Sequence, residues 1–123
     1  MNRIHRSWPA AAALAASALL LAAGSAAAQS AAELLPQKYR DAGVIKLVTD
    51  AKYPPFQYID ESGNMVGFEV DLWNAIAEKL NVTMEVTSVA FDSMIPGVQS
   101  GRWDIAMEAI TDNPERQAVV SFV

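Results

Sequence analysis

Few residues of this chain are of the types that perform catalysis. The sequence contains no Cys, and its only His is His5. Disulfide scaffolds, Cys-ligated zinc, iron–sulfur clusters and thiol nucleophiles are therefore excluded. His5 lies in a segment that we expect to be cleaved, so the mature chain offers no imidazole for a catalytic triad, a proton shuttle or a metal.

The carboxylates do not form an evident acid–base pair either. The nearest pairs are Asp60 with Glu61, in a turn-rich stretch, and Glu69 with Asp71, near a helix start. Solvated or dipole-compensating roles are usual at such places. The sequence has no GxGxxG motif, phosphate loop, nucleophile elbow, HExxH motif or EF-hand spacing. We therefore predict no catalytic residue, no metal site and no cofactor.

Strands are the first elements that must position any binding residue. Mostly apolar or alternating runs predict strands at 44–48, 82–87 and 103–107. Residues 56–59 and 65–68 flank a turn-rich segment and predict a hairpin or wide loop.

Helices are expected between these strands. Apolar residues at helical spacing predict a helix from Asp71 that ends at Asn81. A second helix follows, with Asp92 placed to cap it and Gly101 to close it. Strands that alternate with helices over brief connections imply right-handed crossovers, so the expected fold class is α/β, with a mostly parallel sheet flanked by helices on both faces.

In such sheets, ligands bind where loops leave the carboxyl ends of the strands. Here these loops are 50–56, 90–92 and 108–116. We therefore expect the binding residues to lie in them.

The first 28 residues are typical of a secretory signal peptide. Arg3 and Arg6 form a basic start, residues 10–23 are almost entirely apolar, and three alanines at 26–28 provide a cleavage site. A membrane anchor, the alternative, needs about 18 or more apolar residues. Without Arg3 and Arg6 the chain has seven Lys and Arg against 14 Asp and Glu, a net charge of −7. This charge disfavours nucleic acid as a partner.

Removal of this segment leaves 95 of 123 residues, of which one small domain can be built. We divide the chain into a signal peptide, 1–28, a lead-in segment, 29–43, and the domain itself, 44–123. The lead-in is expected to be a short helix or a disordered arm, and its sequence indicates no function. Hydrophobic residues make up 52% and charged residues 19% of the sequence, which favours a packed core over disorder.

Four segments resemble the family 3 bacterial extracellular solute-binding proteins, the periplasmic polar amino-acid receptors of ABC importers. Their order and spacing agree with the family from about Val44 to Val123. They are Thr49-Asp50 with Tyr53-Pro54-Pro55-Phe56, Gly67-Phe68-Glu69-Val70-Asp71-Leu72, Phe91 to Val98, and Thr111-Asp112-Asn113-Pro114-Glu115-Arg116.

The resemblance implies a carboxylate site in the last of these segments. The family's matching Arg binds the ligand α-carboxylate, and Arg116 has the planar fork of donors that grips two oxygens at once. A hydroxyl at Thr111 and a backbone group at Ala109 are implied to assist. The sequence departs from the family at Asn113, where a second Thr is usual, and at Ala109, where Gly or Ser is usual. A simple surface ion pair remains the alternative for Arg116.

The resemblance also implies contacts to the ligand side chain. Tyr53 and Phe91 match two residues that sandwich it, and Asp50 matches an acidic position that receives an amine, amide or guanidinium. Ordinary core packing of the aromatic residues and a turn role for Asp50 are the alternatives. For Trp73 and Trp103 we expect packing.

The implied receptor has two lobes, roughly 200 or more residues in all. Residues 44–123 can supply only its first lobe, and we interpret 119–123 as a strand cut short before the second. A lone lobe should bind weakly and expose apolar surface. The expected function is capture of an amino acid in the periplasm for an ABC permease. Two alternatives stay open: a cyclohexadienyl or arogenate dehydratase-like enzyme on the same fold, and the sensing domain of a membrane receptor.

Overall fold

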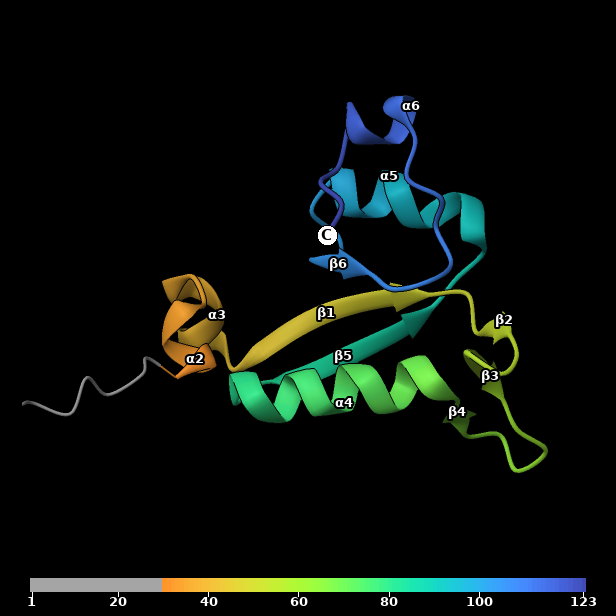
Figure 1. Ribbon diagram of the computed structural model, residues 1–123, viewed down its shortest axis with the longest axis horizontal. Coiled ribbons are helices and arrows are strands. Elements are labelled where there is room, and N and C mark those ends of the chain that lie inside the picture. The colour runs from red at the N-terminus through yellow and green to blue at the C-terminus, as the bar shows by residue number, and fades with distance from the viewer. Residues whose placement is uncertain (1–29) are drawn as a thin grey trace, which may run out of the picture.

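The computed structural model describes residues 30–123 (Figure 1). The expected signal peptide, 1–28, lies outside this range. The described lead-in residues form two short helices, α2 (Ala31–Leu34) and α3 (Gln37–Ala42). The Tyr39 hydroxyl donates to Asp104 Oδ1 at 2.9 Å, which joins α3 to the loop before the last strand.

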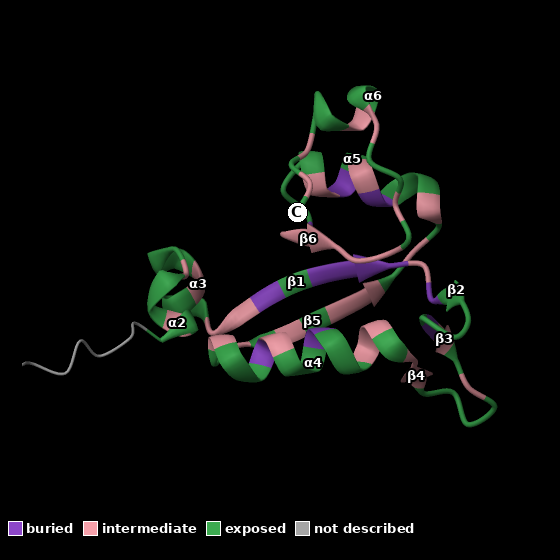
Figure 2. Ribbon diagram, viewed as in Figure 1, coloured by how far each residue is buried: buried purple, intermediate pink, exposed green. Residues whose placement is uncertain are grey.

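The central element is a parallel three-stranded sheet. Its strands are β1 (Val44–Thr49), β5 (Thr83–Ser88) and β6 (Ile105–Ala106), in the order β5-β1-β6. Val44 lies opposite Thr83 and Leu47 opposite Ile105. Strand β1 is the middle strand and the most deeply buried (Figure 2), as its apolar, β-branched sequence predicts.

A second sheet, which is antiparallel, is formed by the segment between β1 and helix α4 (Phe68–Leu80). It consists of β2 (Lys52–Tyr53), β3 (Gln57–Ile59) and β4 (Met65–Val66). The pairing of β3 with β4 confirms the expected hairpin.

Helices lie on both sides of the parallel sheet, which confirms the α/β class (Figure 1). Helix α4 (Phe68–Leu80) packs along β5, and α5 (Met94–Gln99) packs on the other side, after the 3-10 turn η1 (Phe91–Ser93). A four-residue helix, α6 (Pro114–Gln117), follows β6.

Helix α4 ends where expected, at Asn81, but begins three residues earlier than Asp71. The reason lies outside the helix. The amides of Phe68 and Glu69 donate to the carbonyl oxygens of Pro55 and Phe56, at 3.1 and 2.8 Å. These contacts satisfy donors that a helix start otherwise leaves free, so the first turn becomes helical.

Three other local expectations were wrong. Asp92 does not cap α5, because it lies inside η1, which begins after the extended Ala90. The last strand is 105–106 and not 103–107, because the preceding residues turn the Trp103 ring into the core. Residues 119–123 do not form a strand. The amides of Val119 and Val120 instead donate to Arg116 O in a turn.

The core joins the central strand to α5. Val48, Met94 and Trp103 form its buried cluster, and Phe91 packs against it. Trp73 is likewise buried, at 2% exposure, so packing is confirmed for both tryptophans.

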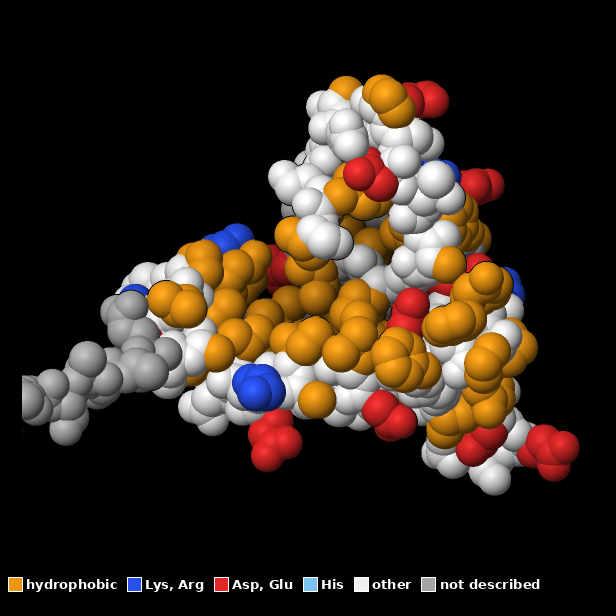
Figure 3. All heavy atoms as spheres, viewed as in Figure 1, with side chains coloured by type: hydrophobic (Ala, Val, Ile, Leu, Met, Phe, Trp, Pro, Cys, Tyr) orange, Lys and Arg blue, Asp and Glu red, His pale blue; other side chains and the backbone are white. Residues whose placement is uncertain are grey.

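Apolar surface also remains exposed. Figure 3 shows a hollow with an apolar floor between α4 and the end of the chain. No helix among residues 30–123 is both long and apolar enough to cross a membrane.

Candidate functional site

The carboxyl ends of β1, β5 and β6 meet at one edge of the sheet. Here the loops that follow them are joined by hydrogen bonds. Val89 N donates to Thr49 O at 2.9 Å, and the Ser88 hydroxyl donates to Asp50 O at 3.0 Å. The Asp50 amide also donates to Glu108 Oε2, at the start of the loop 108–116, at 3.2 Å. The starts of the three loops that the sequence singled out are therefore neighbours in space.

Arg116 lies in α6, and its helix start is built from local signals. Asn113 caps the helix by accepting the Arg116 amide at 2.9 Å, and Pro114 occupies the first helical position. The Arg116 guanidinium donates through Nη1 to Thr111 O at 2.8 Å. Its Cζ atom lies 5.6 Å from the centre of the Phe91 ring, within the range of a cation–π contact.

Arg116 and Phe91 line a cleft of about 380 Å³. The other lining residues come from the same two regions of the chain and are Asp92, Ile95, Asn113, Glu115 and Val119. The cleft thus combines a half-buried guanidinium with an aromatic face. This pairing can hold an anionic group and an adjacent apolar stem.

Asp50 follows β1 directly and is half-buried. Its Oδ1 accepts the Lys52 amide at 2.9 Å, which forms the turn that the alternative interpretation expects. Only one carboxylate oxygen is engaged in this bond. The turn therefore leaves a second oxygen to accept a ligand donor.

Tyr53 is 47% exposed in β2, so it is not a core residue. Its ring stacks on Phe56, with centroids 5.2 Å apart and planes at 14°, and Phe56 meets Phe68 edge to face. The aromatic rings flanking the edge therefore form two groups. One surrounds Tyr53, and the other is the Phe91 ring beneath Arg116.

Ala109 and Thr111 lie in the exposed loop between β6 and α6. Thr111 uses its carbonyl oxygen to fix Arg116.

Sequence reasoning missed one residue at this edge, Glu108. Its carboxylate accepts hydrogen bonds from the Thr49 hydroxyl at 2.9 Å, the Asp50 amide at 3.2 Å and the Gln57 side-chain amide. Thr49 and Gln57 are fully buried. The signal that could have found Glu108 is a carboxylate placed immediately after an apolar strand.

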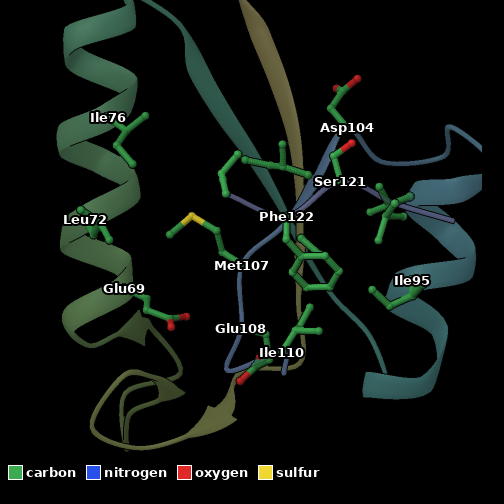
Figure 4. Close-up of a pocket in the computed structure, with 15 residues that line it drawn as sticks. Glu69, Leu72, Ile76, Ile95, Asp104, Met107, Glu108, Ile110, Ser121 and Phe122 are labelled. Atoms are coloured by element: carbon green, nitrogen blue, oxygen red, sulfur yellow. The ribbon is translucent and has the colours of Figure 1, made fainter. Parts of the chain in front are cut away.

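A larger groove of about 520 Å³ lies beside β6, between α4 and α5 (Figure 4). Its walls are mostly apolar, and Phe122 projects into it. Glu69 and Glu108 also line it. Burial, and secondarily repulsion from Glu108, raises the pKa of Glu69 above its ordinary value. Oxygen Oε2 of Glu69 is buried with no hydrogen-bond partner among the described residues.

Among residues 30–123 no group of three or more His, Asp or Glu side chains is arranged to hold a metal ion. The edge brings together the Arg116 guanidinium, aromatic faces and acidic groups. In open α/β sheets, ligands bind in the crevice at the carboxyl ends of the strands, which is where these groups lie.

Comparison with known proteins identifies the class. Residues 45–123 match the bacterial extracellular solute-binding proteins, family 3, and the chain belongs to this family. It is 38% identical over 81 residues to the putative ABC transporter arginine-binding protein 2 of Escherichia coli, covering 66% of this chain and 33% of that protein. It is 34% identical over 82 residues to the cyclohexadienyl dehydratase of Pseudomonas aeruginosa, covering 67% of this chain and 31% of that enzyme.

A solved structure extends the likeness to three dimensions. The arginine-bound form of domain 1 from TmArgBP superposes with a TM-score of 0.67 at 34% identity, covering 72% of this chain and 70% of that one. The chain spans about a third of the length of the curated relatives it matches.

Proposed function

We propose that residues 44–123 are the first lobe of a two-lobed receptor that captures an amino acid in the periplasm and delivers it to an ABC permease. Export would depend on the signal peptide at 1–28. The observation that carries this proposal is the position of Arg116. Its guanidinium stands over Phe91 in an open cleft, with one N–H group bonded to Thr111 O. A guanidinium has five N–H groups, so others are available to a ligand carboxylate.

The ligand class follows from charge and from the relatives. Asp50 has a carboxylate oxygen beyond the one in its turn, which suits a side chain with an amine, amide or guanidinium. A similar curated protein is named for arginine binding, and the similar solved domain 1 is described as arginine-bound. L-arginine is therefore the first ligand to test. In this assignment Tyr53 and Phe91 contact its side chain, while Thr111 and the Ala109 backbone assist Arg116.

Isothermal titration calorimetry of the chain with L-arginine tests the carboxylate role. Arg116→Ala should cost about 1.5 to 3 kcal/mol of binding free energy, because it removes the charge-assisted hydrogen bonds to the ligand carboxylate. The affinity of Arg116→Lys for L-arginine should lie between those of the wild type and Arg116→Ala, because lysine keeps the charge but loses the planar fork. Unaltered affinity in Arg116→Ala would refute the assignment.

Arg102→Ala is the matched control. Arg102 also stacks on an aromatic ring, with Cζ 4.6 Å from the centre of Trp103, but it does not line the cleft. The Arg102→Ala variant should bind arginine with the affinity of the wild type. A lone lobe binds more weakly than a closed receptor, so millimolar arginine should be included in the titration.

Similarity to a dehydratase favours one second candidate, an enzyme on the same fold. Dehydration needs a general acid near the scissile bond. Glu69 has a raised pKa, but it lines the groove beside β6, whereas Arg116 lines the separate cleft. We therefore expect no turnover when arogenate is incubated with the chain. Turnover that is lost in Glu69→Gln would favour the enzyme.

A further inference from the structure

We propose that Glu108 is a positioning residue for ligand binding. It fixes the loop that carries Asp50 and Tyr53 by hydrogen bonding, and its charge is not the feature that matters. The inference rests on the proposed function, because it concerns the same ligand site.

One carboxylate connects three separate parts of the chain. Glu108 Oε2 accepts from the Thr49 hydroxyl at the end of β1, at 2.9 Å, and from the Asp50 amide in the next loop, at 3.2 Å. Its Oε1 accepts from the Gln57 amide on β3. These donors lie 51 to 59 residues before Glu108 in the sequence. Glu108, in the loop after β6, is therefore hydrogen-bonded both to the end of β1 with its following loop and to the hairpin.

Burial gives this arrangement little freedom. Thr49 and Gln57 are fully buried, so each side-chain donor that lost Glu108 would bear the cost of an unsatisfied buried polar group. With its amide held, Asp50 accepts the Lys52 amide at 2.9 Å and directs the chain into β2, where Tyr53 lies. In this proposal Glu108 sets the direction of the segment that carries both Asp50 and Tyr53, and it is not itself a lining residue of the Arg116 cleft.

Substitutions at this position can separate geometry from charge. Glu108→Gln keeps the length of the side chain: its oxygen can accept from Thr49 and Asp50, and its amide can donate to Gln57. Oxygen Oε1 of Gln57 has no partner among residues 30–123. A flip of the Gln57 amide would turn this oxygen toward position 108, where it can accept from the new side-chain amide. Glu108→Asp keeps the charge, but it is one methylene too short to reach all three donors. Glu108→Ala removes every contact.

The experiment measures L-arginine and L-glutamine binding by calorimetry and hydrogen exchange of the Asp50 amide by NMR, all on the full chain. Glu78→Ala is the control, since Glu78 is an exposed acid on α4. If the network positions the loop, Glu108→Asp and Glu108→Ala weaken both ligands by about tenfold or more and speed Asp50 exchange. Glu108→Gln stays within about threefold of the wild type for both ligands and keeps the Asp50 amide protected.

Two results would overturn the proposal. If Glu108→Gln loses arginine as strongly as Glu108→Ala while Glu108→Asp retains it, the carboxylate acts by charge. If the Asp variant melts at a lower temperature but binds both ligands normally, Glu108 is only structural. The Asp and Gln variants decide the matter even if the Ala variant does not fold.

Failure of the proposed function gives a different pattern. A wild-type chain that binds neither amino acid contradicts the receptor assignment. Asp50 exchange still reports on the network in that case. Faster exchange in Glu108→Asp with protection kept in Glu108→Gln supports the positioning role, and unchanged exchange in Glu108→Asp overturns it.

Discussion

Gly97→Ala should destabilise the protein, although the same change usually stabilises a helix. Gly97 lies in α5 and is buried. A Cβ atom at this position would overlap atoms Cζ3 and Cε3 of the Trp103 ring. That ring is 6% exposed and packs with Val48 and Met94, so it cannot swing aside into solvent. The expected cause is therefore overpacking of the core.

Two opposing effects set the size of the loss. Alanine gains about 1 kcal/mol over glycine inside a helix. Overpacking costs typically about 1 to 3 kcal/mol, and overlap with two atoms of a rigid ring belongs at the upper end. The net loss should be about 2 kcal/mol, which for a domain of this size lowers Tm by about 8 to 16 °C.

Thermal unfolding followed by circular dichroism measures this change. Gln99→Ala, at an exposed position of the same helix, is the control and should change stability by less than about 0.5 kcal/mol. Adding Trp103→Phe to Gly97→Ala should recover part of the loss, because the smaller ring makes room for the methyl group. A Tm at or above that of the wild type in Gly97→Ala would refute the packing argument.

Three further changes have defined outcomes. Burial, and secondarily Glu108, raises the pKa of Glu69 above its ordinary value of 4.5. Its stabilising contribution is therefore complete below about pH 4.5 and is lost as pH rises through the folded pKa. In denaturant unfolding, the free energy of unfolding of Glu69→Gln should depend less on pH than that of the wild type and should be larger at pH 7. Asn113→Ala removes the cap of α6, worth about 1 kcal/mol, and calorimetry should find weaker arginine binding because α6 holds Arg116. Gly67→Ala should lower Tm more than Asn113→Ala, because Gly67 has φ of 130° and a Cβ there would overlap backbone carbonyl groups.

Much of the fold could be predicted because its signals are local. The apolar run of β1, the turn-rich centre of the hairpin and the helical spacing before Asn81 each act over a few residues. The predictions of local structure failed where contacts with segments distant in the sequence determined the conformation. Phe68 became helical because Pro55 offers a carbonyl oxygen to its amide. Residues 119–123 are strand-like in composition, but no other described segment pairs with them.

The site divides in the same way. The parallel topology predicted that the loops carrying Asp50, Phe91 and Arg116 would start at one edge, and hydrogen bonds join the starts of these loops there. Their roles toward a ligand stay predictions. The Glu108 network was not predictable, because its donors are remote in sequence and individually unremarkable.

The order of amino acids alone settled the α/β class, the family and the loops that bear the proposed binding residues. These properties depend on short-range patterns and on the rule that parallel strands end at a common edge. Tertiary structure decided which groups touch: the Arg116 guanidinium over the Phe91 ring, and the Glu108 carboxylate among three donors. Such contacts depend on the close approach of segments 25 to 59 residues apart, and that approach is fixed only when the core has packed.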